Sequence, residues 1–241
     1  MKKTVLITGA SRGIGASIAL AFAKAQYNVI INYNKSEKEA KKLEKKLNKI
    51  TKAISIKADV TNDIEVKEMI KVIKKEFKKI DVLINNAGIS NDTEPFSKTK
   101  EDFMQVLDVN VYGVYNVTRY AKEILNKDSS IINIASTNGI DSYYEYSLDY
   151  DASKAAVINL THNLANYLKG IRVNAIAPGW VDTDMNKNLG EFKKQELKKI
   201  LLNRFADPKE IAEVALFLAS DKASYINDTI IKVDGGRRNE Y

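Results

Sequence analysis

The chain has 241 residues and a formal net charge of +7 at pH 7, and its 44% hydrophobic and 29% charged residues exclude a disordered or collagen-like chain. It contains no cysteine and a single histidine, His162, which excludes disulfides, thiolate metal sites and a cysteine nucleophile. A histidine-based metal centre or Ser-His-Asp triad is also disfavoured, so carboxylates, lysine, tyrosine, serine or a bound cofactor must carry any catalysis.

Short runs of β-branched residues alternate with helical patterns along the whole chain. The runs are continuously apolar, which is typical of strands buried on both faces of a parallel sheet. They span residues 4–8, 28–32, 53–58, 81–85, 130–135, 171–177 and 228–233. Helical patterns occupy residues 14–25, 40–50, 66–77, 99–126, 150–168 and 208–220. The alternation predicts an α/β fold, a single-domain Rossmann-type doubly wound parallel sheet over 1–241, with ligands beyond the carboxyl ends of its strands.

Lysine supplies most of the positive charge, and it is interleaved with glutamate in 35-KSEKEAKKLEKKLNKITK-52. This pattern is typical of the solvated face of a helix, and no nucleic-acid-binding motif accompanies it, so we expect no nucleic-acid partner. Glycine and arginine interrupt the first apolar run too early for a signal segment. No stretch approaches the roughly 20 apolar residues that span a bilayer. We therefore expect a soluble, cytoplasmic protein without a membrane partner.

The first predicted strand runs directly into 8-TGASRGIG-15, where Gly9, Gly13 and Gly15 lie between a strand and a helix. Glycines at such a turn let the backbone approach a pyrophosphate, which the helix N-terminus then stabilises. The alternative is a strand–helix turn without a ligand. Because the motif follows the first strand immediately, we favour the nucleotide-binding interpretation.

The end of the second predicted strand distinguishes NAD from NADP. An acidic residue there would bind the ribose 2′-hydroxyl, but 30-IINYNKS-36 has none before Glu37. Arg12 and Lys35 are the cations available for a 2′-phosphate, which accepts bidentate arginine bonds. We therefore predict NADP(H) as the cofactor. The alternative is that Arg12 and Lys35 simply face water.

Tyrosine carries the strongest chemical signal. A phenol titrates near pH 10, but an adjacent ammonium stabilises its anion, and residues four apart share a helix face. Among the twelve tyrosines only Tyr150 has a lysine four residues later, Lys154. The pair could be a surface contact. Ser136, after the 130–135 run, and 85-NNAG-88, after the 81–85 run, instead place polar groups at the same predicted sheet edge.

Together these features resemble the short-chain dehydrogenase/reductase family over essentially the whole chain. The motifs that carry the resemblance are 8-TGASRGIG-15, Asp59-Val60, 85-NNAG-88, Asn110, Ser136, the Tyr150/Lys154 pair, 178-PG-179 with Thr183, and 234-DGG-236. The resemblance implies a seven-stranded sheet, a nicotinamide cofactor, no metal, and a catalytic tetrad. The tetrad would consist of Asn110, Ser136, Tyr150 and Lys154.

The resemblance also implies a role for each member of this tetrad. Ser136 would orient the substrate carbonyl, and Tyr150 would be the general acid in reduction and the base in oxidation. Lys154 would lower the pKa of the Tyr150 phenol and contact the nicotinamide ribose. Asn110 would help to hold a water molecule that links Lys154 to solvent. The nicotinamide would supply the hydride.

Further cofactor contacts follow from the same resemblance. They fall in four segments of the chain. These are the glycine loop (Gly9, Ser11, Arg12, Gly13, Ile14, Gly15) with Lys35, the adenine pair Asp59 and Val60, the ribose segment Asn86, Ala87 and Gly88, and the nicotinamide segment Pro178, Gly179 and Thr183. Asp59 has an alternative role as an N-terminal cap of the following helix. Residues 183–207 correspond to the substrate lid of the family.

Within the family, 171–185 and 225–236 look most like the 3-oxoacyl-acyl-carrier-protein reductases of fatty acid synthesis. The resemblance therefore favours an NADPH-dependent reductase of a ketone carried on acyl-carrier protein. Ser136 and Tyr150 are 14 positions apart, one more than is typical, which leaves another small ketone or a sugar-like alcohol open. A catalytically silent NADP-binding regulator is the alternative of another class. The family also implies a homo-oligomer, a tetramer or dimer.

Overall fold

The computed structural model describes residues 2–183, 186 and 189–238. It contains one seven-stranded sheet in which every neighbouring pair is parallel, with the order β3-β2-β1-β4-β5-β6-β7. The strands are β1 (Thr4–Ile7), β2 (Asn28–Tyr33), β3 (Ala53–Lys57), β4 (Ile80–Asn85), β5 (Leu125–Ile134), β6 (Arg172–Pro178) and β7 (Ile230–Val233). All seven predicted strands are confirmed.

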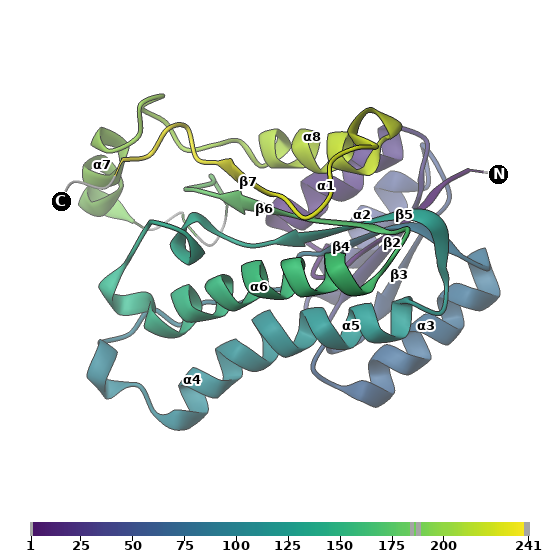
Figure 1. Ribbon diagram of the computed structural model, residues 1–241, viewed down its shortest axis with the longest axis horizontal. Helices are drawn as coiled ribbons and strands as arrows, with labels where there is room; N and C mark the ends of the chain where they lie inside the picture. The colour runs from purple at the N-terminus through teal and green to yellow at the C-terminus, as the bar shows by residue number, and fades with distance from the viewer. Residues whose placement is uncertain (1, 184–185, 187–188, 239–241) are drawn as a thin grey trace.

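Helices cover both faces of the sheet (Figure 1). The helices are α1 (Gly13–Lys24), α2 (Glu37–Leu47), α3 (Asp63–Phe77), α4 (Lys100–Leu107), α5 (Gly113–Ala121), α6 (Leu148–Tyr167), α7 (Gly190–Lys198) and α8 (Pro208–Ala219). One core cluster joins the strands to α1, α2 and α8, and a second joins them to α3, α5 and α6. The predicted doubly wound α/β fold is confirmed, because each parallel strand is buried by helices on both sides.

The helix predicted over 99–126 is the main difference from the sequence-based expectation. It consists of α4, one π-helical turn at Asp108–Tyr112, and α5, and β5 already begins at Leu125. The periodic apolar pattern continues through the turn, so it cannot signal a change in helical hydrogen bonding. π-turns occur frequently at functional sites, and this one carries Asn110.

The direction in which successive strands are added to the sheet changes between β1 and β4. Strands β2 and β3 lie on one side of β1, and β4 to β7 lie on the other. In open α/β sheets ligands bind outside the carboxyl ends of the strands at this point. Helix α7 lies beyond that edge of the sheet (Figure 1). Within the described ranges, no helix is long and apolar enough to cross a bilayer, and no three acidic or histidine side chains gather into a metal site.

Candidate active site

The glycine loop lies between β1 and α1, at the switch point. Gly9 has φ +60°, and a Cβ there would lie 2.8 Å from the Cα of Ala87, so both conformation and space require glycine. Helix α1 starts at Gly13 without a side-chain cap and without an acidic residue in its first turn. Its first backbone N–H groups are therefore left for an anion, as a pyrophosphate site requires.

Three polar side chains hold this loop in place. The Thr8 hydroxyl accepts hydrogen bonds from the backbone N–H groups of Asn86 and Ala87, at 2.9 and 3.0 Å. The Asn86 amide donates to the carbonyls of Thr8 and Gly9, at 2.9 and 3.1 Å. The buried Asn32 accepts from the Gly9 N–H at 3.3 Å and donates to the Ala58 carbonyl at 2.9 Å. The roles of Thr8 and Asn32 were not predicted from the sequence, although the Asn32 amide inside the apolar run 28-NVIINY-33 was a usable signal.

The predicted cations lie beside this loop with exposed side chains. Arg12 precedes α1, and Lys35 follows β2. Asp59 and Val60 follow β3, and Asp59 accepts hydrogen bonds from Thr61 and Asn34. Burial opposes the charge of Asp59, but these hydrogen bonds outweigh it and leave the pKa below its ordinary value. Asp59 does not cap α3, because Asn62 accepts the N–H groups of that helix, so the capping alternative was wrong.

Asn110 is fully buried in the π-helical turn after α4. Its side-chain oxygen accepts from the Ile89 N–H at 2.8 Å, and its amide donates to the Ile89 carbonyl and to the Ser153 hydroxyl, both at 2.9 Å. A Cβ on Gly88 would lie 3.3 Å from the Asn110 oxygen and 3.6 Å from Lys154 Nζ. The loop after β4 and helix α6 therefore meet at Asn110, with Gly88 leaving space in front of both side chains.

Ser136, Tyr150 and Lys154 come together at the carboxyl end of β5. Ser136 is buried immediately after that strand, and its hydroxyl lies close enough to the Tyr150 phenol to lower the pKa of that phenol. Lys154 Nζ lies 5.4 Å from the centre of the Tyr150 ring and donates to the Ile134 carbonyl at 2.8 Å. The three predicted residues therefore lie close together in the fold, and Tyr150 and Lys154 occupy one face of α6.

Burial dominates the titration of both α6 side chains. It raises the pKa of Tyr150 to about 12, although the hydrogen bond with Ser136 acts in the opposite direction. It lowers the pKa of Lys154 to about 8. The expectation that Lys154 brings the phenol below its ordinary pKa is therefore wrong for this structure. Desolvation disfavours phenolate and ammonium alike, and it is the largest cause of both shifts.

The nicotinamide segment begins where β6 ends. Pro178 closes that strand, and a Cβ on Gly179 would lie 2.8 Å from the Cβ of Asp234. Thr183 lies beside the glycine loop, because a Cβ on Gly13 would lie 3.7 Å from its methyl group. Apart from Lys154 on α6, the cofactor residues expected from the sequence thus lie in the segments that follow β1 to β4 and β6.

The predicted lid at 183–207 contains α7, while residues 184–185 and 187–188 lie outside the described residues. The buried Glu196 of α7 accepts from the Trp180 indole at 2.8 Å and from Arg237 at 2.9 Å. The ring centres of Phe192 and Tyr144 lie 5.3 Å apart. Helix α7 is therefore joined both to the segment after β6 and to the loop before α6.

A groove of about 440 Å³ opens between this helix and the loop before α6. Its apolar walls come from Tyr143, Tyr144, Leu148 and Phe192. Asp151, the residue after Tyr150, also lines it. Charged side chains, Glu145, Asp151, Glu196 and Lys199, form the rest of its lining.

A glycine-rich turn, a helix N-terminus without a side-chain cap and a Ser–Tyr–Lys group at one sheet edge define a dinucleotide-binding oxidoreductase. A family model described as Enoyl-(Acyl carrier protein) reductase matches residues 9–238. The chain is 41% identical over 242 residues to the 3-oxoacyl-[acyl-carrier-protein] reductase FabG of Staphylococcus epidermidis, covering 98% of this chain and 99% of that protein. The reductase of the same name from Thermotoga maritima is 39% identical over 245 residues, with 97% of each chain covered.

Solved structures agree with these sequence relatives. A short chain dehydrogenase from Burkholderia cenocepacia J2315 in complex with NADP superposes with a TM-score of 0.94 at 32% identity, covering 97% of each chain. A short-chain dehydrogenase/reductase from Serratia marcescens superposes with a TM-score of 0.93 at 31% identity, again covering 97% of each chain. The chain belongs to the short-chain dehydrogenase/reductase family.

Proposed function

We propose that this chain is an NADPH-dependent reductase that converts a 3-oxoacyl group on acyl-carrier protein to the 3-hydroxyacyl group. The observation that carries the proposal is the proximity of Ser136 to the Tyr150 phenol, with Lys154 Nζ 5.4 Å from the centre of the Tyr150 ring. The substrate class is supported by relatives named as 3-oxoacyl-[acyl-carrier-protein] reductases along the full length of the chain.

In this proposal the side chains position the substrate and move one proton. The bound nicotinamide supplies the hydride that reaches the carbonyl carbon. The Ser136 hydroxyl donates a hydrogen bond to the carbonyl oxygen, and the Tyr150 phenol gives that oxygen its proton, which completes the alcohol. Burial raises the pKa of this phenol, so it carries its proton at neutral pH, as a proton donor must. The Lys154 ammonium stabilises the phenolate that is left.

We assign the cofactor contacts to the residues expected from the sequence. The free N-terminus of α1 and the glycine loop would hold the pyrophosphate, and Asp59 with Val60 would flank the adenine. Asn86, Ala87 and Gly88 would flank the adjoining ribose. Pro178, Gly179 and Thr183 would meet the nicotinamide. We also assign residues 1–241 to one domain, with 183–207 as the substrate lid.

Arg12 is expected to select NADPH over NADH. Its exposed guanidinium precedes α1, beside the end of β2, where a 2′-phosphate would accept charge-assisted hydrogen bonds. Arg12→Ala should raise the KM for NADPH about tenfold and leave the KM for NADH within about twofold, since one such bond contributes ~1.5 kcal/mol. Steady-state kinetics with both cofactors will measure this. Lys38→Ala, which removes an exposed charge on α2, is the control, and equal effects of the two variants would contradict the assignment.

The substrate class is tested by NADPH oxidation with acetoacetyl-acyl-carrier protein, a crotonyl thioester, a simple diketone and a keto-sugar. We expect the 3-oxoacyl thioester to react with the highest kcat/KM, because the Ser–Tyr pair is arranged around a carbonyl oxygen. The enoyl thioester should not react, since a carbon–carbon double bond offers no oxygen to that pair. Preferred turnover of the crotonyl thioester or the keto-sugar would replace the proposed substrate, and no turnover of any of them would reject the reductase assignment.

A further inference from the structure

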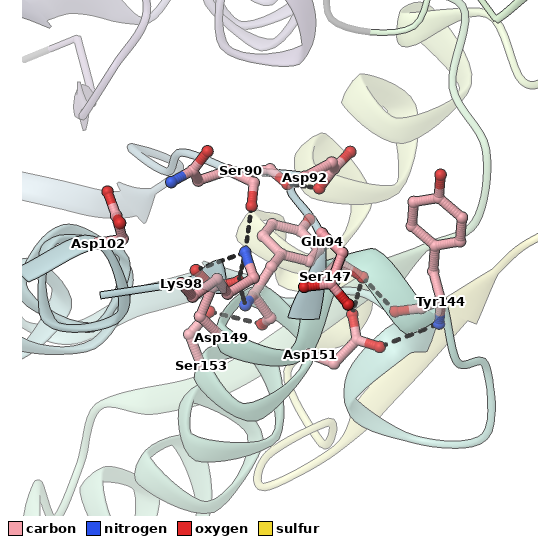
Figure 2. Close-up of polar contacts among 12 residues, drawn as sticks. Ser90, Asp92, Glu94, Lys98, Asp102, Tyr144, Ser147, Asp149, Asp151 and Ser153 are labelled. Carbon is pink, nitrogen blue, oxygen red and sulfur yellow. Dashed lines mark hydrogen bonds and ion pairs between the residues drawn. The ribbon is translucent and has the colours of Figure 1, made fainter. Parts of the chain in front are cut away.

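A buried ion pair includes Asp149, the residue that precedes the proposed catalytic tyrosine. Lys98 Nζ is 3.1 Å from both carboxylate oxygens of Asp149, and the two side chains are 3% and 0% exposed. Figure 2 shows the two residues facing one another between the loop after β4 and the start of α6. Residues 51 positions apart in sequence are thereby joined within the fold.

Asp149 acts on Tyr150 through the backbone. Its Oδ1 accepts the Tyr150 N–H at 2.9 Å, in the first turn of α6, where N–H groups have no partner within the helix. Ser147, at the cap position, contributes no side-chain cap. The carboxylate that binds Lys98 therefore also holds the amide of the residue that carries the phenol.

Lys98 acts on the loop after β4. Its ammonium also donates to the Asn91 carbonyl, within the same loop. The other end of that loop is held at Ile89, whose N–H and carbonyl both bond the side chain of Asn110. Asn110 and the Lys98–Asp149 pair thus hold the loop at two points, one beside Lys154 and the other beside Tyr150.

The two carboxylates on either side of Tyr150 have different surroundings. Asp151 accepts hydrogen bonds from Asn138, Ser147 and the Tyr144 N–H, at 2.7, 2.7 and 3.2 Å, and Figure 2 shows the last two of these partners. All three donors are neutral. Asp149 instead faces the ammonium of Lys98. Of these two carboxylates, only the fully buried Asp149 is paired with a cation.

A buried ion pair of this kind is weak evidence for a gain in stability. The cost of removing two charges from water commonly equals or exceeds their attraction, and well-packed neutral residues are often as stable. The pair instead fixes the positions of two segments that border the site. Lys98 bonds the backbone of the loop after β4, and Asp149 bonds the backbone of the first turn of α6.

We propose that Lys98 and Asp149 are positioning residues that join the loop after β4 to the first turn of α6 and thereby hold the Tyr150 phenol in register with Asn110 and Lys154. The proposal rests on the proposed function of Tyr150 as the proton donor. It assigns no direct contact with substrate to either residue.

The test uses Lys98→Met, Asp149→Asn, the double variant, and the control Lys100→Met, which removes an exposed charge two residues away. We expect each single variant to lower kcat at least about tenfold, because misplacement of a catalytic group by 1 Å can cost 10²-fold. The KM for NADPH should stay within about twofold. The double variant should lose no more kcat than either single variant, since all three remove the same interaction. The control should match wild type.

The double variant leaves no unpaired buried charge, so it keeps the test decisive if a single variant folds poorly. Three results would overturn the proposal. The first is wild-type kcat in a folded single variant, and the second is a loss of kcat in the double variant equal to the product of the two single losses. The third is an equal rise of the KM for NADPH and the KM for the ketone substrate. Amide hydrogen exchange of unliganded protein tests the positioning separately from turnover. Lys98→Met should speed exchange of the Tyr150 amide about tenfold, and unchanged exchange would also overturn it. Inactive wild-type enzyme would reject the proposed function alone.

Discussion

Tyr150→Phe will reduce ketone reduction about 10³-fold while NADPH binding and the folded structure are retained. The phenol is the proposed proton donor, and a positioned general acid contributes on the order of 10²–10⁴ in rate. Phenylalanine keeps the ring, so it preserves the packing around a side chain that is half-buried beside Ser136. Single-turnover measurements with saturating NADPH will isolate the chemical step, and cofactor fluorescence will report binding.

The matched control for this variant is Tyr167→Phe. Tyr167 is the last residue of the same helix, its side chain is 70% exposed, and its hydroxyl bonds only an exposed lysine in the described contacts. The control removes the same atom at a distance from the site, so it should leave kcat and KM at wild-type values. Retention of more than about one tenth of wild-type turnover by Tyr150→Phe would reject the acid–base role of this phenol.

Lys154→Met will change the pH dependence of the free energy of unfolding by about 2 kcal/mol between pH 7 and pH 10. Burial lowers the pKa of Lys154 to about 8, from its ordinary value of 10.5. Between these values the unfolded chain binds more protons than the folded one, so this lysine makes the wild type more stable as the pH rises. Below pH 8 the folded protein carries the full cost of the buried ammonium, ~3 kcal/mol.

Methionine at position 154 is apolar and does not titrate, so it removes the contribution of Lys154 to the pH dependence of the free energy of unfolding. Relative to wild type, the variant should be most stable at pH 7 and should lose that advantage steadily up to pH 10. The hydrogen bond from Lys154 to the Ile134 carbonyl is lost at every pH and shifts the whole curve without changing its slope. Urea unfolding at four pH values will measure the difference. Identical slopes for wild type and variant would contradict it, and exposed Lys100→Met should follow wild type.

The Lys154→Met comparison is limited to pH 10 and below because Tyr150 changes the pH dependence of stability above that pH. Burial raises its pKa to about 12, and its ordinary value is 10. Above pH 10 the unfolded phenol loses its proton before the folded one does, so this tyrosine lowers stability as pH rises. The two buried α6 side chains therefore have opposite effects on stability in adjoining pH ranges.

Most of the fold was predictable because its signals are local. Seven continuously apolar runs indicated seven buried strands, and each run coincides with a strand in the structure. The π-helical turn at Asn110 was not predictable, since the apolar repeat continues through it. The early start of β5 was also missed, because polar residues occupy the first half of that strand.

The candidate site was likewise predictable from the sequence only in part. Spacing in the chain predicted that Tyr150 and Lys154 share a helix face, and strand ends predicted that Ser136 lies near them. The sign of the Tyr150 pKa shift was predicted wrongly. An ion-pair argument from spacing considers attraction only, whereas burial contributes the larger effect and depends on the whole surroundings.

The amino-acid sequence by itself determined the doubly wound sheet, the glycine turn before α1, and the side chains available for chemistry, because each depends on residues within one or two turns or strands. Tertiary structure alone decided how deeply the phenol and ammonium are buried, and hence their protonation. It also decided that Lys98 meets Asp149 at the start of α6. Desolvation and long-range pairing depend on the atoms that other segments bring close, and no periodicity along the chain encodes them.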